Sequence, residues 1–516
     1  MQGVVAAVAE PIAHKRDTLG RKYIWQASDP QPHQRFRDWR DFVAYENKRI
    51  ERVKAGVGDA EPVIDAACVC TLDTQHVEVI LALVPLGLHI LSEKPLATTL
   101  QDCLAIYRSL TPFGSTERQA NIFGLGHVLR YSPHNMLLRK LLLEDRVVGD
   151  VLGVEHTEPV GWWHFSHSYV RGNWRREDTT APSLLTKSCH DIDLLLWLLC
   201  SPANAEGDEA PHLPSSVSSV GHRAFFKKAR KPTGAGNATN CLRCPIERDC
   251  NYSAKKIYAE KHLQKGETGW PVDIVEPEIE DFYQKHGPQI AEKILLQRLA
   301  EDYNACKASP EYVKSRNWFG RCVWESDNNV CDDQNVNIIW EDGVNDGTGK
   351  PARPAKTATF HQIAHTEAQC ARRGRVYGSH GELTYDSKTI RVFDFGTSTA
   401  KEYHPTQTDF NDPIAKHGGG DTGLAQQFIS AVSAVKNEEM EVERAQKHHL
   451  GCTPEDVLRS HAMVFAAEEA RRSKTIIDWQ SWWHKNVGGT SPIALSKRPS
   501  NGNGGWQMVD TNEATT

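Results

Sequence analysis

Three short apolar runs in the first hundred residues each end in polar residues and precede a helical pattern. They are VVAAVAEP (4–11), PVIDAACVCTLDTQH (62–76) and HILSEKP (89–95). Short, nearly continuous apolar runs are typical of strands that are covered on both faces of a sheet. Their alternation with helices favours a parallel α/β sheet with right-handed crossovers. This alternation constrains the fold more than any other feature, and it predicts a ligand site beyond the carboxyl ends of the strands.

The pattern changes after about residue 120, so we divide the chain there. We expect a parallel-sheet domain over 1–120 and a second α/β domain over 121–485, interrupted by an insertion at about 201–320 that is rich in loop residues. The glycine-rich and polar end of the chain, 486–516, is typical of a disordered tail.

Charge and cysteine content exclude several classes of protein. The chain of 516 residues has 60 basic and 66 acidic residues and a formal charge of −6, which argues against a nucleic-acid partner. No run approaches the roughly 20 apolar residues of a membrane helix, and the N-terminus has no secretory pattern. The chain has 13 cysteines, and an odd number in a long chain favours reduced thiols over a framework of disulfides. We therefore expect a cytoplasmic protein without a membrane partner.

The polar residues at the strand ends are the candidate cofactor ligands. An acid after a strand is where dinucleotide-binding folds hold the ribose hydroxyls. Taken alone, Glu10 could be a solvated turn residue, but three polar strand ends in this order favour a cofactor domain. The candidates are Glu10, Thr71, Asp73, His76, Glu93 and Lys94.

Several motifs together resemble the glucose–fructose oxidoreductase/inositol dehydrogenase (Gfo/Idh/MocA) family. They are VVAAVAEP, DAACVCTLDTQH, SEKPLA, HVLRYSP, VGDVLGVEH and CHDIDLLLW, in the family's order up to about residue 200, with YGSHGEL and HGGGDTG further on. The resemblance implies an α/β fold in which a Rossmann-type parallel sheet, N-terminally incomplete, precedes an α/β domain with a large, mostly antiparallel sheet. It also implies a bound NAD or NADP and hydride transfer at a secondary alcohol of a sugar, a polyol or a related compound.

Lys94 and His190 are the catalytic candidates. The resemblance places Lys94 beside nicotinamide and substrate, where an ammonium can stabilise an alkoxide or, with a lowered pKa, move a proton. The alternative for Lys94 is a surface ion pair with Glu93. His190 is the natural proton shuttle because imidazole titrates near neutrality, and the alternative is a satisfied core histidine. Relatives often carry Asp where this chain has Thr186.

Further polar and aromatic residues are candidate substrate ligands. His190, Asp193 and Trp197 share one helical face by their spacing. A segment rich in Trp, His and Arg (161–178) suits a polyhydroxylated substrate, although such residues also form interfaces, as in a homo-oligomer. The substrate candidates are Arg130, Tyr131, His164, Arg171, Trp174, Lys187 and Asp191.

The phosphate-binding loop of the family has no counterpart in this sequence. A Gly-x-Gly-x-x-Gly loop should precede VVAAVAEP, and it normally cradles the pyrophosphate. Either the sequence is shortened or this relative has lost cofactor binding, and we favour shortening. The alternatives to an oxidoreductase are an NAD-dependent glycosidase of the same family type and a catalytically inactive sugar sensor.

Two further sequence patterns concern ligands. Glu10 favours NAD over NADP because it would repel a 2′-phosphate, although the basic residues 14–16 weaken this preference. CLRCPIERDC places Cys241, Cys244 and Cys250 at a spacing typical of metal ligands, but a closed structural zinc site needs four ligands. Cys322 and Cys331 could complete the set through space, and a loop of reduced thiols is the alternative.

Overall fold

The structure is a computed structural model that describes residues 3–57, 63–111, 119, 121–202, 209–343, 353–405 and 416–488. The predicted tail therefore lies outside the described residues from position 489 onward. Parallel strands form the N-terminal part, as the sequence predicts. β1 (Val8–Ala9) pairs with β2 (Arg35–Phe36), and a separate sheet has the order β3 (Ala66–Val69), β4 (His89–Ser92) and β5 (Phe123–Leu125). The parallel sheet thus extends beyond residue 120.

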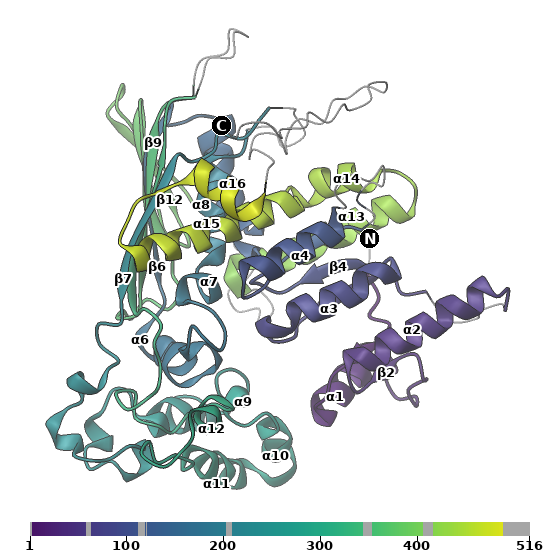
Figure 1. Cartoon of the computed structure of the whole chain (residues 1–516), viewed down its shortest axis with the longest axis vertical. Coiled ribbons are helices and arrows are strands. Elements are labelled where there is room, and N and C mark those ends of the chain that lie inside the picture. Colours follow the sequence, from purple (N-terminus) through teal and green to yellow (C-terminus); the bar gives the residue numbers. More distant parts are fainter. Residues whose placement is uncertain are drawn as a thin grey trace, which may run out of the picture.

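Helices alternate with these strands along the chain (Figure 1). Two of them begin at side-chain caps, because Asp38 accepts from the backbone N–H of Arg40 and Thr99 accepts from that of Asp102. The helices of this part are α1 (Ala13–Tyr23), α2 (Trp39–Lys54), α3 (His76–Leu83) and α4 (Leu100–Leu110).

A large sheet dominates the rest of the molecule. In the described part of the chain it has nine strands in the order β13-β12-β11-β10-β6-β9-β8-β7-β14, and every neighbouring pair is antiparallel except β6 and β9. This confirms the large, mostly antiparallel sheet. Its strands are β6 (Val151–Pro159), β7 (Ser216–His222), β8 (Asp333–Trp340), β9 (Lys356–Ile363), β10 (Arg373–Gly378), β11 (Gly381–Tyr385), β12 (Ile390–Asp394), β13 (Thr399–Tyr403) and β14 (Ile477–Asp478).

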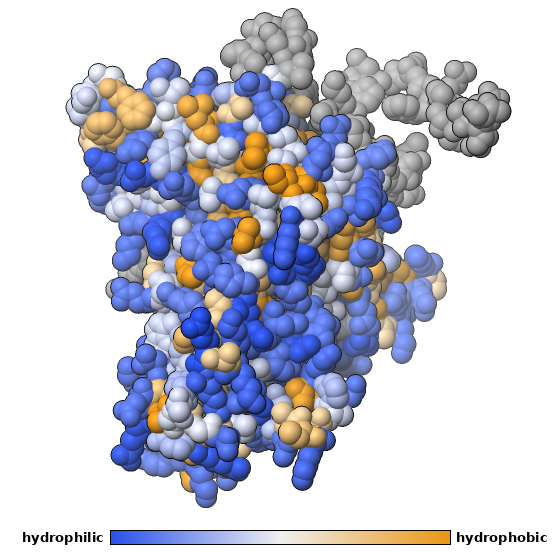
Figure 2. Space-filling model, turned by 60° about the vertical axis from the view of Figure 1, so that its left-hand side comes forward, coloured by the Kyte–Doolittle hydropathy of each residue, from blue (hydrophilic) through white to orange (hydrophobic). Residues whose placement is uncertain are grey.

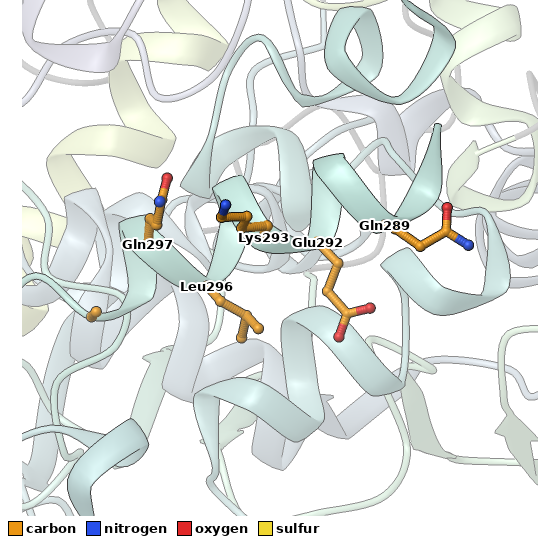
Figure 3. A pocket seen from close by; sticks show the side chains of 6 residues that line it. Gln289, Glu292, Lys293, Leu296 and Gln297 are labelled. Carbon is orange, nitrogen blue, oxygen red and sulfur yellow. The ribbon is translucent and has the colours of Figure 1, made fainter. Parts of the chain in front are cut away.

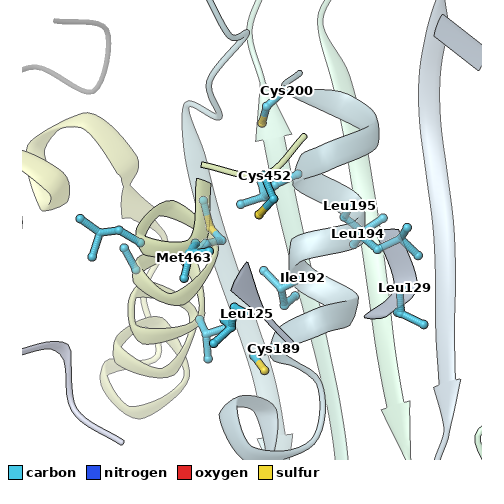
Figure 4. Packing of buried hydrophobic residues seen from close by; sticks show 14 of the residues in the cluster. Leu125, Leu129, Cys189, Ile192, Leu194, Leu195, Cys200, Cys452 and Met463 are labelled. Atoms are coloured by element: carbon cyan, nitrogen blue, oxygen red, sulfur yellow. The ribbon is translucent and has the colours of Figure 1, made fainter. Parts of the chain in front are cut away.

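Two buried helices join the large sheet to the parallel sheet. α8 (Cys189–Leu199) and α15 (Pro454–Ser473) pack against each other, and α15 also contacts β7 and α4. Figure 4 shows their contact, with Ile192 and Met463 facing one another across it. Apolar side chains of both sheets and both helices therefore form one continuous core. The remaining helices outside the insertion are α5 (Pro133–Arg139), α6 (Trp162–Phe165), α7 (Ser183–Thr186), α13 (Gly420–Lys436), α14 (Val442–Ala445) and α16 (Trp479–Val487).

An insertion without sheet strands separates β7 from β8. It runs over 223–332, somewhat later than the predicted 201–320, and forms the lower part of Figure 1. Its helices are α9 (Val272–Val275), α10 (Ile279–His286), α11 (Pro288–Leu299) and α12 (Pro310–Lys314). The face of the molecule in Figure 2 is mostly hydrophilic, with scattered apolar spots. Among the described helices, none combines the length and the apolar character needed to cross a bilayer.

Candidate active site

Lys94 lies directly after β4, at the carboxyl edge of the parallel sheet. Its Nζ donates to the carbonyl oxygen of Thr186 at 2.6 Å, and its peptide bond to Pro95 is cis. Burial lowers the pKa of Lys94, and the nearby Lys187 adds to this effect, while Cys189 and Glu93 oppose it. The amine therefore faces the interior beside α7, and in the described structure it forms no ion pair with Glu93. Thr186 contributes its backbone oxygen to this contact.

His190 is held as a neutral imidazole on the first turn of α8. Arg372 donates from Nη2 to His190 Nε2 at 2.8 Å, so the ring proton resides on Nδ1. Burial and the Arg372 charge hold the pKa of His190 well below its ordinary value. His190 Nδ1 is buried and has no hydrogen-bond partner among the described residues. A buried N–H without a partner is a donor available to a ligand.

A buried network of charges surrounds His190. Arg372 contacts Asp191 at 2.5 Å and Glu158 at 3.0 Å, and Asp191 also lies 3.1 Å from His156. Burial acts to raise the pKa of Asp191, but Arg372 outweighs it and keeps that pKa well below its ordinary value. Lys187 lies 3.3 Å from Glu158. Two carboxylates thus balance two cations inside the protein, as buried charges require.

Sequence reasoning missed Glu158 and Arg372. A signal for Glu158 was present: His156 and Glu158 alternate with period two in β6 and so face the core together with Val154, where polar residues need partners. No comparable pattern marks Arg372, whose partners are 181 and 182 residues away in the sequence.

Lys187, Cys370 and His164 form a second group near the amine. Lys187 Nζ lies 3.0 Å from Cys370 Sγ, and His164 Nδ1 lies 3.5 Å from the same sulfur. Burial acts to lower the pKa of Lys187, but Cys370 and Glu158 outweigh it and hold the pKa above its ordinary value. Burial lowers the pKa of His164, and the Lys187 charge adds to this effect. Lys187 is therefore a cation, and His164 is neutral.

The end of β3 contributes polar groups to the same edge of the sheet. Asp73 Oδ2 accepts from Trp174 Nε1 at 2.9 Å, and the Trp174 ring centroid lies 6.0 Å from Lys94 Nζ. Thr71 Oγ1 is buried without a hydrogen-bond partner among the described residues. The ring of His76 lies between the carbonyl oxygens of Pro95 and Thr71, at 2.7 and 3.1 Å. Strand ends that are far apart in sequence therefore meet around Lys94.

Glu10, at the end of β1, stabilises the turn into α1. Its Oε1 accepts from the backbone N–H of Ile12 at 2.7 Å, and its carbonyl oxygen accepts from Arg16 at 2.5 Å. The structure therefore gives Glu10 a local structural contact, and its role toward a ribose stays a prediction.

Three of the predicted substrate ligands are engaged elsewhere. The guanidinium of Arg130 makes two hydrogen bonds to Asp193, at 2.7 and 2.8 Å, and Tyr131 donates to the carbonyl of Leu450. Arg171 donates to backbone carbonyls in the insertion. These contacts do not support a direct role toward substrate, and the predicted role stays untested. Asp193 likewise faces Arg130 and His127 rather than His190.

A surface hollow on the insertion differs chemically from the groups around Lys94. It measures about 430 Å³ and follows one face of α11, where Gln289, Glu292, Lys293, Leu296 and Gln297 line it (Figure 3). It has ordinary surface side chains and no buried titratable group. We therefore place the candidate site at Lys94 and not at this hollow.

One group of potential metal ligands lies near α8. Among the described residues, only His127, Cys189 and His461 bring three ligand atoms within 4.8 Å of one another. His461 Nε2 already accepts from the backbone N–H of Leu96, and its Nδ1 faces the Val457 carbonyl at 2.8 Å. His461 thus has no free lone pair for a metal, so this group does not fit a metal site.

The described part of the chain thus combines parallel strands, a lysine at their carboxyl edge and a large mixed sheet. Residues 6–114 match the model of the Gfo/Idh/MocA family, described as an oxidoreductase family with an NAD-binding Rossmann fold. In this N-terminal part, the chain is therefore similar to proteins of the Gfo/Idh/MocA family.

Curated relatives align over part of their length. The 2,7-anhydro-N-acetylneuraminate hydratase of Escherichia coli (strain K12) is 24% identical over 36% of this chain and 42% of its own length. The 1,5-anhydro-D-fructose reductase of Ensifer adhaerens is 30% identical over 30% of this chain and 42% of its own length. The chain thus spans less than half the length of these relatives.

A solved structure of levoglucosan dehydrogenase with NADH and levoglucosan has a similar fold. Its TM-score is 0.51 at 14% identity, and the match covers 92% of this chain and 90% of that one. At this identity the likeness shows the fold alone.

Two buried polar groups near Lys94 fit a polar ligand such as part of a dinucleotide. The unpaired Thr71 hydroxyl and His190 Nδ1–H are buried polar groups that a ligand would satisfy. Within the described ranges, no turn from strand to helix carries Gly-x-Gly-x-x-Gly. The groups that would bind the pyrophosphate are therefore not assigned.

Proposed function

We propose that this chain is an NAD-dependent oxidoreductase that moves a hydride to or from a secondary alcohol of a sugar-like or polyol-like molecule. Lys94 carries the proposal: it is a partly buried amine with a lowered pKa at the carboxyl edge of a parallel sheet, next to unpaired polar groups. Relatives named as an anhydrofructose reductase and an inositol 2-dehydrogenase support this substrate class.

The chemistry divides between cofactor and protein. Bound NAD would supply the hydride acceptor. Oxidation of the alcohol also requires loss of its hydroxyl proton, and a lowered pKa makes the neutral Lys94 amine available to take it. In the reverse direction the Lys94 ammonium donates that proton to the developing alkoxide.

Neighbouring residues orient the substrate in this proposal. Arg372 fixes the His190 tautomer, so Nδ1–H can donate a hydrogen bond to a substrate oxygen. Asp73 fixes the Trp174 ring, which provides a flat apolar surface for a sugar ring. Lys187 adds a permanent positive charge that favours an oxyanion.

A reaction with transient oxidation and no net change of NAD is the second candidate. Lys187 favours it, because a second cation near Lys94 would stabilise the enolate that forms next to a transient ketone. Glycoside cleavage and elimination both belong to this class, and two relatives are named as hydratases. Substrate consumption without accumulation of NADH would distinguish it from simple dehydrogenation.

A turnover assay with matched lysine variants tests the proposal. The full chain is mixed with NAD and a panel of cyclic polyols and anhydro-sugars, and NADH absorbance and product formation are both followed. Lys94→Ala should lower kcat roughly 10²–10⁴-fold, the usual contribution of a general acid–base group, and should leave NAD affinity nearly unchanged. Lys22→Ala, which removes an exposed lysine, should behave as the wild type.

The pH dependence gives a second readout. Because the proton acceptor must be neutral, oxidation should rise with pH through the pKa of Lys94, and this limb should lie below the ordinary lysine value of 10.5. Lys94→Ala should lack the limb. Full turnover by Lys94→Ala, or ligand binding by the wild type without any chemistry, would contradict the proposal.

A further inference from the structure

Four cysteines of the insertion line one small cavity. Cys241, Cys244, Cys250 and Cys322 surround a space of about 20 Å³. About 10–15 Å³ is enough for one water-sized sphere, so the cavity matches a single ion and not a larger cofactor. Cys331, the other candidate for a fourth ligand, does not line it.

The backbone fixes the relative position of these cysteines. An antiparallel bridge joins Asn240 to Arg321, and the N–H groups of Cys241 and Cys322 donate to carbonyls of the opposite segment, each at 2.8 Å. A tight turn brings Cys244 back toward Cys241, with its N–H bonded to the Cys241 carbonyl at 3.2 Å. Main-chain contacts therefore hold Cys241, Cys244 and Cys322 around one space.

A buried arginine faces the same cavity. Arg171 is 1% exposed and lines the cavity, and its Nη2 lies 3.4 Å from Cys241 Sγ. Nε and Nη2 also donate to the carbonyls of Arg321 and Tyr252, but Nη1 is buried without a partner among the described residues. A buried guanidinium with an unused N–H group is stabilised by nearby negative charge. Glu247 also lines the cavity and contacts Ser253, and thiolates would add negative charge next to Arg171.

We propose that these four cysteines bind one zinc ion as thiolates in a closed structural site. Binding of Zn²⁺ to four thiols releases four protons and leaves a centre of net charge −2, which Arg171 partly neutralises. Zinc–sulfur bonds of about 2.3 Å require sulfurs closer together than the thiols lie here, since this cluster has no three ligand atoms within 4.8 Å. In this proposal the cysteine side chains change rotamer when the ion binds, which moves the sulfurs inward.

The site would connect the insertion to the candidate active site. Arg171 ends the π-helical segment Ser166–Arg171, and Trp174 follows three residues later. With four protein ligands the ion has no open position, so its role is to hold this wall in place and not to bind substrate. The inference stands without the proposed hydride transfer.

Metal analysis of the full chain tests the inference. Protein purified without chelator should contain about one zinc per chain, as one closed site requires. Cys244→Ser and Cys322→Ser should each retain less than a tenth of that zinc. Cys331→Ser and Cys306→Ser are the matched controls and should retain all of it.

Two further measurements use the wild-type protein, so they test the inference even if the cysteine variants fold poorly. Cobalt added alone to the zinc-depleted wild type should give the intense visible bands of a tetrahedral thiolate site. Zinc added to the same protein should protect four thiols from a thiol reagent. Absence of bound zinc together with absence of the cobalt bands would overturn the inference. Iron with acid-labile sulfide, or loss of zinc in Cys331→Ser but not in Cys322→Ser, would also overturn it.

Discussion

At the scale of single residues, the environment of His190 determines what this side chain can do. A histidine that shuttles a proton must change its charge near neutral pH. Burial and the Arg372 guanidinium instead keep the pKa of His190 well below its ordinary value. His190 therefore stays neutral across physiological pH. The sequence predicted that it shuttles a proton, and in our proposal it instead donates a hydrogen bond through Nδ1.

A pair of substitutions separates these two roles of His190. Glutamine keeps a neutral donor but cannot shuttle a proton, so His190→Gln should retain roughly ten-fold more activity than His190→Ala, since a hydrogen bond to a reacting group contributes about 1.5 kcal/mol. Steady-state kinetics over pH 5–9 would measure this difference in activity. The pH–rate profile of the wild type should show no change in rate from titration of His190. Equal losses in both variants would support proton transfer by the imidazole.

At the scale of elements, the outer edge of β5 is covered by a side chain in place of a strand. Phe123 pairs with β4 on one side. On the other side its N–H donates to Gln446 Oε1 at 2.9 Å, and its carbonyl accepts from Gln446 Nε2 at 2.7 Å. Gln446 is 1% exposed and also donates to the carbonyl of Cys452. One amide thus completes the hydrogen bonds of a buried sheet edge.

Replacement of Gln446 should destabilise the parallel sheet. Gln446→Leu leaves buried backbone groups unpaired, and because each costs about 1–3 kcal/mol we expect the free energy of unfolding to fall by about 2–5 kcal/mol. Denaturant titration measures this, and hydrogen exchange at the Phe123 N–H should accelerate. Gln289→Leu, on the exposed face of α11, is the control. An unchanged exchange rate at Phe123 would contradict the role of Gln446.

Local sequence patterns predicted many of the helices and strands. They did not predict which residues that are distant in the sequence contact each other. The parallel strands and the polar residues at their ends follow from periodicity and strand-end chemistry, and the broad second sheet follows from the family resemblance. Which residue a buried charge contacts depends on the tertiary fold: Lys94 bonds to a carbonyl 92 residues away, and Phe123 bonds to Gln446 across 323 residues. Spacing in the sequence carries no information about such pairs.

At the scale of the whole molecule, the insertion contacts the first helix of the parallel-sheet part. His14 Nδ1 lies 3.1 Å from Asp281, and Lys15 Nζ lies 3.3 Å from Asp273. Arg16 is turned back onto the carbonyl of Glu10. The basic residues that could have accepted a 2′-phosphate are therefore engaged, two of them by acids from a segment more than 250 residues further along the chain.

We expect these contacts to influence the choice between NAD and NADP. Because Glu10 would repel a 2′-phosphate and the nearby cations are occupied, NADH should bind more tightly than NADPH. Asp273→Asn combined with Asp281→Asn should release Lys15 and His14 and shift the ratio several-fold toward NADPH, since a partly exposed charge contact contributes about 0.2–1 kcal/mol. Fluorescence titration with both dinucleotides measures the ratio, and Glu292→Gln on α11 should leave it unchanged.

Tighter binding of NADPH by the wild type, or an unchanged ratio in the double variant, would show that the insertion does not set the preference. No binding of either dinucleotide would contradict the assignment of a cofactor to this chain.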